Sequence, residues 1–207
     1  MPPLTREAHL DFACGYGTFL AQLGWRFPSS ALVVHLDPEL VEERTHVKEG
    51  VKGWDKSITV IGSLFYPFAI LIVAALDARF GWPPRIAVTV QIAALVIAAA
   101  GDTTSVRAMA VNRFYSRFVR IQRDRGHIPI SDGPYRYVRH PGYLGQMIFS
   151  LASAPALGSL WALIPGGLFA LLLAIRTALE DKMLRDELEG YEEYAQRVRY
   201  RLIPGIC

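Results

Sequence analysis

The chain has 207 residues, 52% of them hydrophobic, and a mean hydropathy of +0.24, a size that suits one domain or one membrane bundle. Its formal charge of +3 is too small to indicate nucleic acid as a partner. Cys14 and Cys207 lie far apart and lack the spacing of metal ligands. We therefore expect neither a disulfide framework nor a metal site.

The N-terminal residues 1–36 are moderately apolar and contain Gly15 and Gly17 in the stretch LDFACGYGTFLAQL, with Asp37 following 20 residues after Gly17. This arrangement resembles the first motif of soluble Rossmann-type methyltransferases. The alternating strands and helices of such a fold do not follow, so we favour small-residue packing in a first membrane element. A nucleotide-binding role is the alternative. Residues 37–55 are charged and predict a polar interfacial helix and turn.

Apolar residues then gather in three blocks, at 57–77, 84–101 and 143–177. Since about 17–25 apolar residues cross a hydrocarbon core as a helix, these blocks predict an integral membrane protein. The third block is about 35 residues long and contains Pro155 and Gly158, so it predicts two helices joined by a tight turn. A soluble protein with buried helices is the alternative, although such helices are usually shorter or amphipathic.

These blocks predict an all-α membrane bundle of about four to five transmembrane helices with a cytoplasmic C-terminal helix. Within one membrane domain, we assign 1–56 to an N-terminal membrane-associated or interfacial segment and 57–112 to a transmembrane hairpin. Residues 113–207 would hold a loop, a second hairpin and the C-terminal helix.

The stretch 102–125 keeps helical spacing while becoming polar, so the second helix is expected to project beyond the bilayer. Basic residues concentrate there and after the last apolar block, which predicts that both regions face the cytoplasm. Attraction to anionic lipid explains most of these side chains without a catalytic role. They are Arg113, Arg117, Arg120, Arg123, Arg125, Arg136 and Arg139, followed by Lys182, Arg185, Arg197, Arg199 and Arg201.

The stretch 133–145, GPYRYVRHPGYLG, combines turn-forming glycines and prolines with tyrosines, arginines and a histidine. Such a mixture packs poorly in a core, because the polar ends of tyrosine and arginine need partners. It indicates a functional site, and an aromatic and cationic loop at the membrane interface is the alternative. Arg176 and Glu180, four residues apart on one helix face, return to the same side after an even number of crossings. They form either an exposed ion pair or part of a pocket.

GPYRYVRHPGYLG, Arg176, Glu180-Asp181, Tyr191, Tyr194 and the closing RLIP together resemble the isoprenylcysteine carboxyl methyltransferase family, related to phospholipid methyltransferases, over roughly residues 38–204. The resemblance implies S-adenosylmethionine as cofactor. Asp181 stands where many relatives have a second glutamate, and the first 35 residues do not resemble the family's opening helices. The implied cofactor contacts are His127, Ile128, Pro129, Ile130, Tyr135, His140, Pro141, Gly142, Tyr143 and Glu180.

The resemblance also implies that Arg176 binds the substrate and that Arg176 and Glu180 are the catalytic pair. A methyl sulfonium carries its own leaving group, so alignment and exclusion of water are the main tasks. For His140 we favour a structural role over that of a base. We expect a methyltransferase acting on a lipophilic or lipidated substrate at the cytoplasmic membrane face. The alternatives are a phospholipid N-methyltransferase-like enzyme and a non-enzymatic protein that binds anionic membrane lipid.

Overall fold

The structure, a computed structural model, describes residues 50–205. This range contains helices and turns and no strand. The α-helices are α5 (Gly53–Phe80), α6 (Val88–Val111), α7 (Pro141–Ala156), α8 (Leu163–Glu187) and α9 (Tyr191–Arg197), with short 3₁₀ turns η1 (Arg123–Arg125) and η2 (Gly133–Arg136). The Gly15 and Gly17 stretch and the segment predicted at 37–49 lie outside the described residues.

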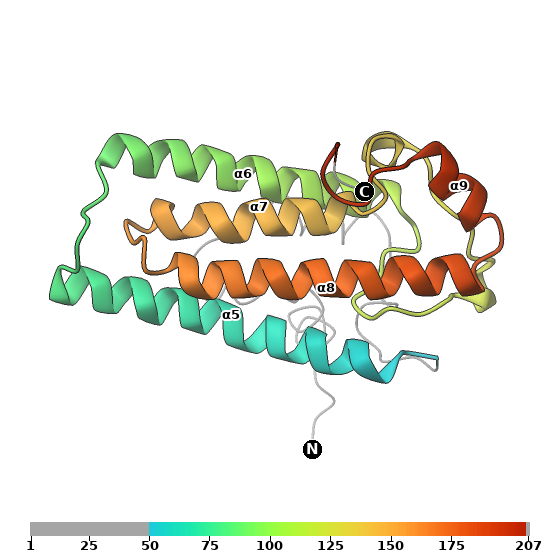
Figure 1. The fold of residues 1–207 in the computed structure, drawn as a ribbon, viewed down its shortest axis with the longest axis horizontal. Helices are drawn as coiled ribbons and strands as arrows, with labels where there is room; N and C mark the ends of the chain where they lie inside the picture. Colours follow the sequence, from blue (N-terminus) through green and yellow to red (C-terminus); the bar gives the residue numbers. More distant parts are fainter. Residues whose placement is uncertain (1–49, 206–207) are drawn as a thin grey trace, which may run out of the picture.

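The four long helices lie side by side in the order α6, α7, α8, α5, and each runs antiparallel to its neighbour (Figure 1). Short connections at 81–87 and 157–162 join them at one end. The loop 112–140, α9 and the C-terminal segment gather at the other end. The predicted break inside 143–177 is confirmed, because α7 ends at Ala156 and α8 begins at Leu163.

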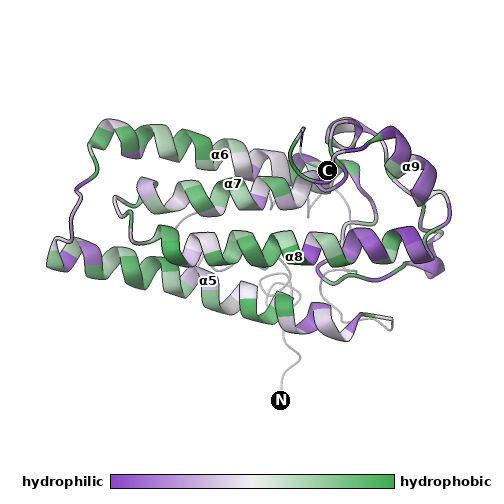
Figure 2. Cartoon of the chain, in the orientation of Figure 1, coloured by the Kyte–Doolittle hydropathy of each residue, from purple (hydrophilic) through white to green (hydrophobic). Residues whose placement is uncertain are grey.

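Within residues 50–205, three helices, α5, α6 and α8, are long and apolar enough to cross a membrane. Their outward side chains are apolar as well: Phe65, Val96 and Leu168 are each more than half exposed, as lipid-facing residues would be. Hydrophilic residues gather instead at the end formed by α9 and the second half of α8 (Figure 2). The prediction of an all-helical membrane protein agrees with this part of the chain, and the number of four to five crossings stays a prediction.

The expectation of a helix continuing through 102–125 is wrong, because α6 ends at Val111. The side chain of Asn112 accepts the backbone N–H of Phe114 at 2.9 Å, which turns the chain away from the helix axis. Farther along, the backbone N–H of Val119 donates to Asp55 at the start of α5. These side-chain acceptors replace the helical hydrogen bonds that the spacing had predicted.

Small residues let α6 and α7 pack backbone to backbone. A Cβ atom placed on Gly101 would lie 2.7 Å from the carbonyl oxygen of Gly145 and 2.8 Å from the backbone nitrogen of Phe149. The hydroxyl of Ser105, one turn farther along α6, donates to the carbonyl of Gly142 at 3.0 Å. This close approach at Gly101 sets where α7 begins relative to α6.

The helices α5 and α8 meet through an aromatic contact. The rings of Tyr66 and Phe169 stack with centroids 4.4 Å apart. Gly62 makes room for this contact, since a Cβ atom there would lie 2.9 Å from the Phe169 ring. Both helix pairs thus depend on a glycine.

Replacing Gly101 by alanine is expected to lower the free energy of unfolding by about 1–3 kcal/mol, because the new methyl group meets backbone atoms that cannot move aside. The measurement is thermal or denaturant unfolding of the detergent-solubilised protein. Gly167→Ala in α8 is the control, since no atom lies within 4 Å of its Cβ position. That variant should be as stable as the wild type or slightly more so. Equal losses in the two variants would contradict the proposed packing.

Candidate functional site

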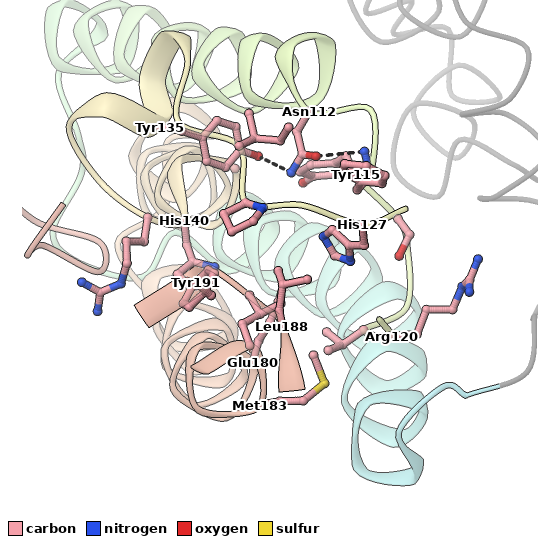
Figure 3. A pocket seen from close by; sticks show the side chains of 18 of the residues that line it. Asn112, Tyr115, Arg120, His127, Tyr135, His140, Glu180, Met183, Leu188 and Tyr191 are labelled. Atoms are coloured by element: carbon pink, nitrogen blue, oxygen red, sulfur yellow. Dashed lines mark hydrogen bonds between the residues drawn. The ribbon is translucent and has the colours of Figure 1, made fainter. Parts of the chain in front are cut away.

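A pocket lies at the hydrophilic end of the bundle, between the loop 112–140, the start of α7, the second half of α8 and α9. It contains about 780 Å³ of empty space, counting the part open to solvent. In Figure 3, His127, Tyr135 and His140 from the loop and Glu180 and Met183 from α8 surround it.

Nine of the ten residues predicted to contact the cofactor line this pocket, so the structure brings the two distant parts of the sequence together. They are His127, Ile128, Pro129, Ile130, Tyr135, His140, Gly142, Tyr143 and Glu180. Pro141 does not line it, because this residue is fully buried as the first residue of α7. Arg176 does not line it either and lies behind Tyr143, with its guanidinium carbon 5.2 Å from the centre of the Tyr143 ring.

Glu180 is the acidic side chain of the pocket wall. The hydroxyl of Tyr143 donates to its carboxylate at 2.5 Å. Two cationic side chains of the wall already have acidic partners, since Arg120 pairs with Asp124 and Arg139 with Asp181. Within residues 50–205, no ion pair joins Glu180 to a basic side chain. Its negative charge is therefore available to a cationic ligand.

His127 forms part of the wall as a neutral ring. Its Nδ1 accepts the backbone N–H of Gln122 at 3.3 Å, and its ring packs on Phe114 with centroids 4.5 Å apart. Burial, followed by the positive charges of Arg120 and Arg125, lowers the pKa of His127 to about 4. The imidazole therefore stays uncharged near neutral pH, and its Nε2 carries the proton.

Tyr135 contributes a hydroxyl to the opposite part of the wall. The side-chain amide of Asn112 donates to this hydroxyl at 3.2 Å (Figure 3). The Tyr135 carbonyl accepts the Tyr194 hydroxyl at 2.9 Å, which fixes the loop against α9. Burial raises the pKa of Tyr135 well above its ordinary value, so the phenol stays protonated and its proton can be donated to a ligand.

Asp181 is the centre of a buried network directly behind the pocket. The guanidinium of Arg139 donates to its two oxygens at 2.7 and 3.1 Å. The Tyr191 hydroxyl donates to it at 3.0 Å, and His140 Nε2 lies 3.3 Å from the same oxygen. Two more guanidinium groups approach its other oxygen from farther away, those of Arg185 and Arg201. Asp181, which stands where many relatives have a second glutamate, is thus the common acceptor of this buried network and does not line the pocket.

The same network ties the C-terminal segment to the motif loop. Arg139 donates from one nitrogen to the carbonyls of Val198 and Arg199, both at 2.7 Å. The backbone N–H groups of Arg139 and His140 donate to the carbonyls of Tyr200 and Arg201. Burial alone would lower the pKa of Arg139, but its hydrogen bonds and charge contact with Asp181 raise it above the usual value. The His140 ring nitrogen Nε2 lies 3.3 Å from both Asp181 and the Tyr191 hydroxyl, so these contacts and its backbone N–H fix its position.

Arg176 has its own buried acidic partner. Its Nε and Nη2 donate to the two oxygens of Asp55 at 2.7 and 3.3 Å, and Nη2 also donates to the carbonyl of Arg117 at 2.7 Å. Asp55 is completely buried. Of the two alternatives from the sequence, the exposed ion pair between Arg176 and Glu180 is not formed, because Arg176 instead joins α8 to the first turn of α5.

Sequence reasoning missed the part of the wall that precedes the motif. Four of its residues, Asn112, Phe114, Tyr115 and Phe118, line the pocket. The stretch was assigned to a projecting helix, which hid their role. Asn112 directly after an apolar run, followed by three aromatic residues, was the signal for a turn and a binding wall. The wall also includes Met183, Leu184 and Leu188, whose spacing reads as ordinary helix packing.

Asp181→Asn is expected to lower the free energy of unfolding by about 3–5 kcal/mol, because it leaves the buried Arg139 guanidinium without its charge partner. Denaturant unfolding in detergent measures the loss. Glu187→Gln, which breaks the exposed pair with Lys52, is the matched control and should cost less than about 1 kcal/mol. Similar losses in both variants would show that Asp181 is not the common acceptor of this network.

The lowered pKa of His127 predicts in which direction the stability of the protein changes with pH. A group whose pKa falls on folding contributes stability above its unfolded value of 6.5, and that contribution is lost as the pH falls toward about 4. Wild type should therefore lose stability relative to His127→Asn, which keeps an acceptor for Gln122, as the pH is lowered from 7.5 to 4.5. Unfolding midpoints of the two proteins across this range provide the measurement. Parallel pH profiles would contradict a neutral, buried His127.

Residues 91–186, from α6 to the end of α8, match the sequence profile of the family described as "Isoprenylcysteine carboxyl methyltransferase (ICMT) family". A protein-S-isoprenylcysteine O-methyltransferase of Schizosaccharomyces pombe is 33% identical over 89 residues, which are 41% of this chain and 36% of that protein. Two probable protein-S-isoprenylcysteine O-methyltransferases of Oryza sativa, from the indica and japonica subspecies, are 27% identical over 187 residues. That match covers 84% of this chain and 92% of each rice protein.

The matched region contains the motif loop, the pocket wall before it, and the helix that carries Arg176 and Glu180. The resemblance deduced from GPYRYVRHPGYLG and the residues of α8 is thereby confirmed. Over residues 91–186 the chain is similar to the isoprenylcysteine carboxyl methyltransferase family.

Proposed function

We propose that this membrane protein is an S-adenosylmethionine-dependent methyltransferase that esterifies the carboxylate of an isoprenylated cysteine. Similarity to this family supports the reaction class, and the names of the relatives indicate the acceptor. The observation that carries the proposal is Glu180, an acidic side chain in the wall of a pocket whose arginines are paired with other acids.

The residues of the pocket fit this methyl donor. The Glu180 carboxylate, which has no ion-pair partner among the described residues, complements a cationic sulfonium or ammonium, and Tyr143 holds it in place. The aromatic rings of Phe114, Tyr115 and Tyr135 offer apolar surface on which the adenine of the donor could pack. The hydroxyl of Tyr135 and the Nε2–H of His127 add donors of defined orientation.

When bound, S-adenosylmethionine supplies an electrophilic methyl group with its own leaving group. An acceptor carboxylate is ionised near neutral pH, so no general base is required of the chain. Transfer forms a carbon–oxygen bond at the acceptor and breaks the carbon–sulfur bond, which removes a positive charge from the pocket. Glu180 therefore favours the donor over the product, and the surrounding aromatic wall keeps water from the reacting atoms.

The position of the pocket suits a lipid-modified acceptor. It opens at the end of helices whose outer faces carry apolar side chains such as Phe65 and Leu168, so an isoprenyl chain could stay in lipid while its cysteine reaches the wall. We place this end on the cytoplasmic side. The loop 112–140 holds seven arginines, whereas the connection 81–87 at the opposite end holds Arg85 alone.

Calorimetry on detergent-purified protein tests the donor site. S-adenosylmethionine should bind more tightly than S-adenosylhomocysteine, and Glu180→Gln should reduce this preference by about tenfold, because a charge-assisted contact contributes about 1.5–3 kcal/mol. Glu187→Gln, seven residues farther along, is the control and should leave both affinities unchanged. If neither compound binds, the proposal is overturned. If Glu180→Gln leaves the preference for S-adenosylmethionine unchanged, Glu180 does not bind the donor.

A methyl-transfer assay with labelled donor then identifies the acceptor. N-acetyl-S-farnesylcysteine should be methylated, whereas its carboxamide and phosphatidylethanolamine should not. Labelling of the phospholipid alone would favour the N-methyltransferase alternative over esterification. Donor binding without transfer to any acceptor in a wider panel of amphiphiles would separate the cofactor assignment from the acceptor assignment.

A further inference from the structure

The buried ion pair between Asp55 and Arg176 joins two helices beside the pocket. Asp55 lies in the first turn of α5, where the helix dipole stabilises a negative charge. Its oxygens accept Nε and Nη2 of Arg176, and one of them also accepts the backbone N–H of Val119 at 2.7 Å. Val119 itself belongs to the pocket wall. A residue outside the matched family region thus reaches both the arginine and the wall.

This arrangement uses two nitrogens of the guanidinium and leaves the third. Nε and Nη2 donate to Asp55 and to the Arg117 carbonyl, while Nη1 has no hydrogen-bond partner among residues 50–205. The Arg176 side chain keeps 10% of its exposure, so it is not sealed on every side. Tyr143, whose ring lies over the guanidinium, lines the pocket and binds Glu180.

The geometry of a guanidinium shows what the remaining Arg176 nitrogen, Nη1, can bind. Arginine presents five N–H donors in a fixed planar fork, so holding two nitrogens also fixes the direction of the third. A lone arginine would pair with an acceptor carboxylate through two nitrogens in either of two orientations. With Asp55 in place, one nitrogen is left to contact one carboxylate oxygen, and the second oxygen stays unpaired.

We propose that Asp55 is a positioning residue that holds Arg176 so that its Nη1 binds one oxygen of the acceptor carboxylate and leaves the other oxygen to accept the methyl group. This inference rests on the proposed function. Asp55 contacts neither donor nor acceptor, and it acts on the acceptor through Arg176, while its contact with the Val119 backbone holds the wall. It also balances the charge of a buried arginine next to Glu180, which would otherwise compete for the same guanidinium.

The test compares an acid with its neutral isostere. In wild type, the KM for N-acetyl-S-farnesylcysteine should lie well below the inhibition constant of its carboxamide. Asp55→Asn should raise the KM for the acid about tenfold and change the inhibition constant of the carboxamide by less than about twofold, because only the acid depends on the charged contact. The affinity for S-adenosylhomocysteine should be unchanged, which also shows that the pocket is folded.

Asp55→Glu provides a second variant that keeps the charge but displaces the guanidinium, and it should raise the KM for the acid to an intermediate extent. Phe169→Leu is the structural control, since it weakens the same contact between α5 and α8 through the Tyr66 ring without touching Arg176. It should leave the ratio between acid and carboxamide unchanged.

Two outcomes would overturn the inference. The first is a loss of acid and carboxamide affinity to the same extent in the Asp55 variants. The second is an equal change of the ratio in Phe169→Leu, which would reduce Asp55 to a helix contact. Failure of the proposed function would look different, because wild type itself would then not bind S-adenosylhomocysteine or would not methylate the acid.

Discussion

The hydrophilic end of this molecule depends on the buried carboxylate of Asp181. It receives Arg139 from the motif loop, Tyr191 from α9, and the approach of Arg201 from the C-terminal segment. A carboxylate at this depth is stable only when such donors surround it, and the donors in turn need the carboxylate. The motif loop is therefore fixed to α8, α9 and the C-terminal segment around one charge, and the pocket lies between the motif loop, α8, α9 and the loop 112–122.

The electrostatics of the pocket follow from which charges are already matched. Asp181 matches Arg139, Asp55 matches Arg176, and Asp124 matches Arg120. Glu180 has a tyrosine hydroxyl as its partner, which fixes its position and leaves its charge in place. A wall whose acidic residue is Glu180, beside the neutral side chains of His127 and Tyr135, suits a cationic donor that becomes neutral as it reacts.

Sequence reasoning reached the helical architecture, the break after α7 and most of the motif loop, because these depend on long apolar runs and on glycine and proline positions. Helical spacing placed Arg176 and Glu180 on one face, as an ion pair or as part of a pocket, but Arg176 pairs with a buried aspartate 121 residues earlier in the chain. Such a pairing depends on how α5 packs against α8, which no local pattern encodes. The turn at Asn112 was hidden in the same way, since its side chain overrides a favourable helical period.

The order of the helices separates two tasks that one enzyme must combine. The loop 112–140 and α7 lie toward α6, whereas α5 packs on the other side of α8 and brings Asp55 to Arg176 (Figure 1). The family profile covers the former group and stops short of the latter. Under the proposed function, substitutions in α5 would act on acceptor binding through Asp55 and Arg176, while Glu180 and the start of α7 would keep their places in the pocket wall.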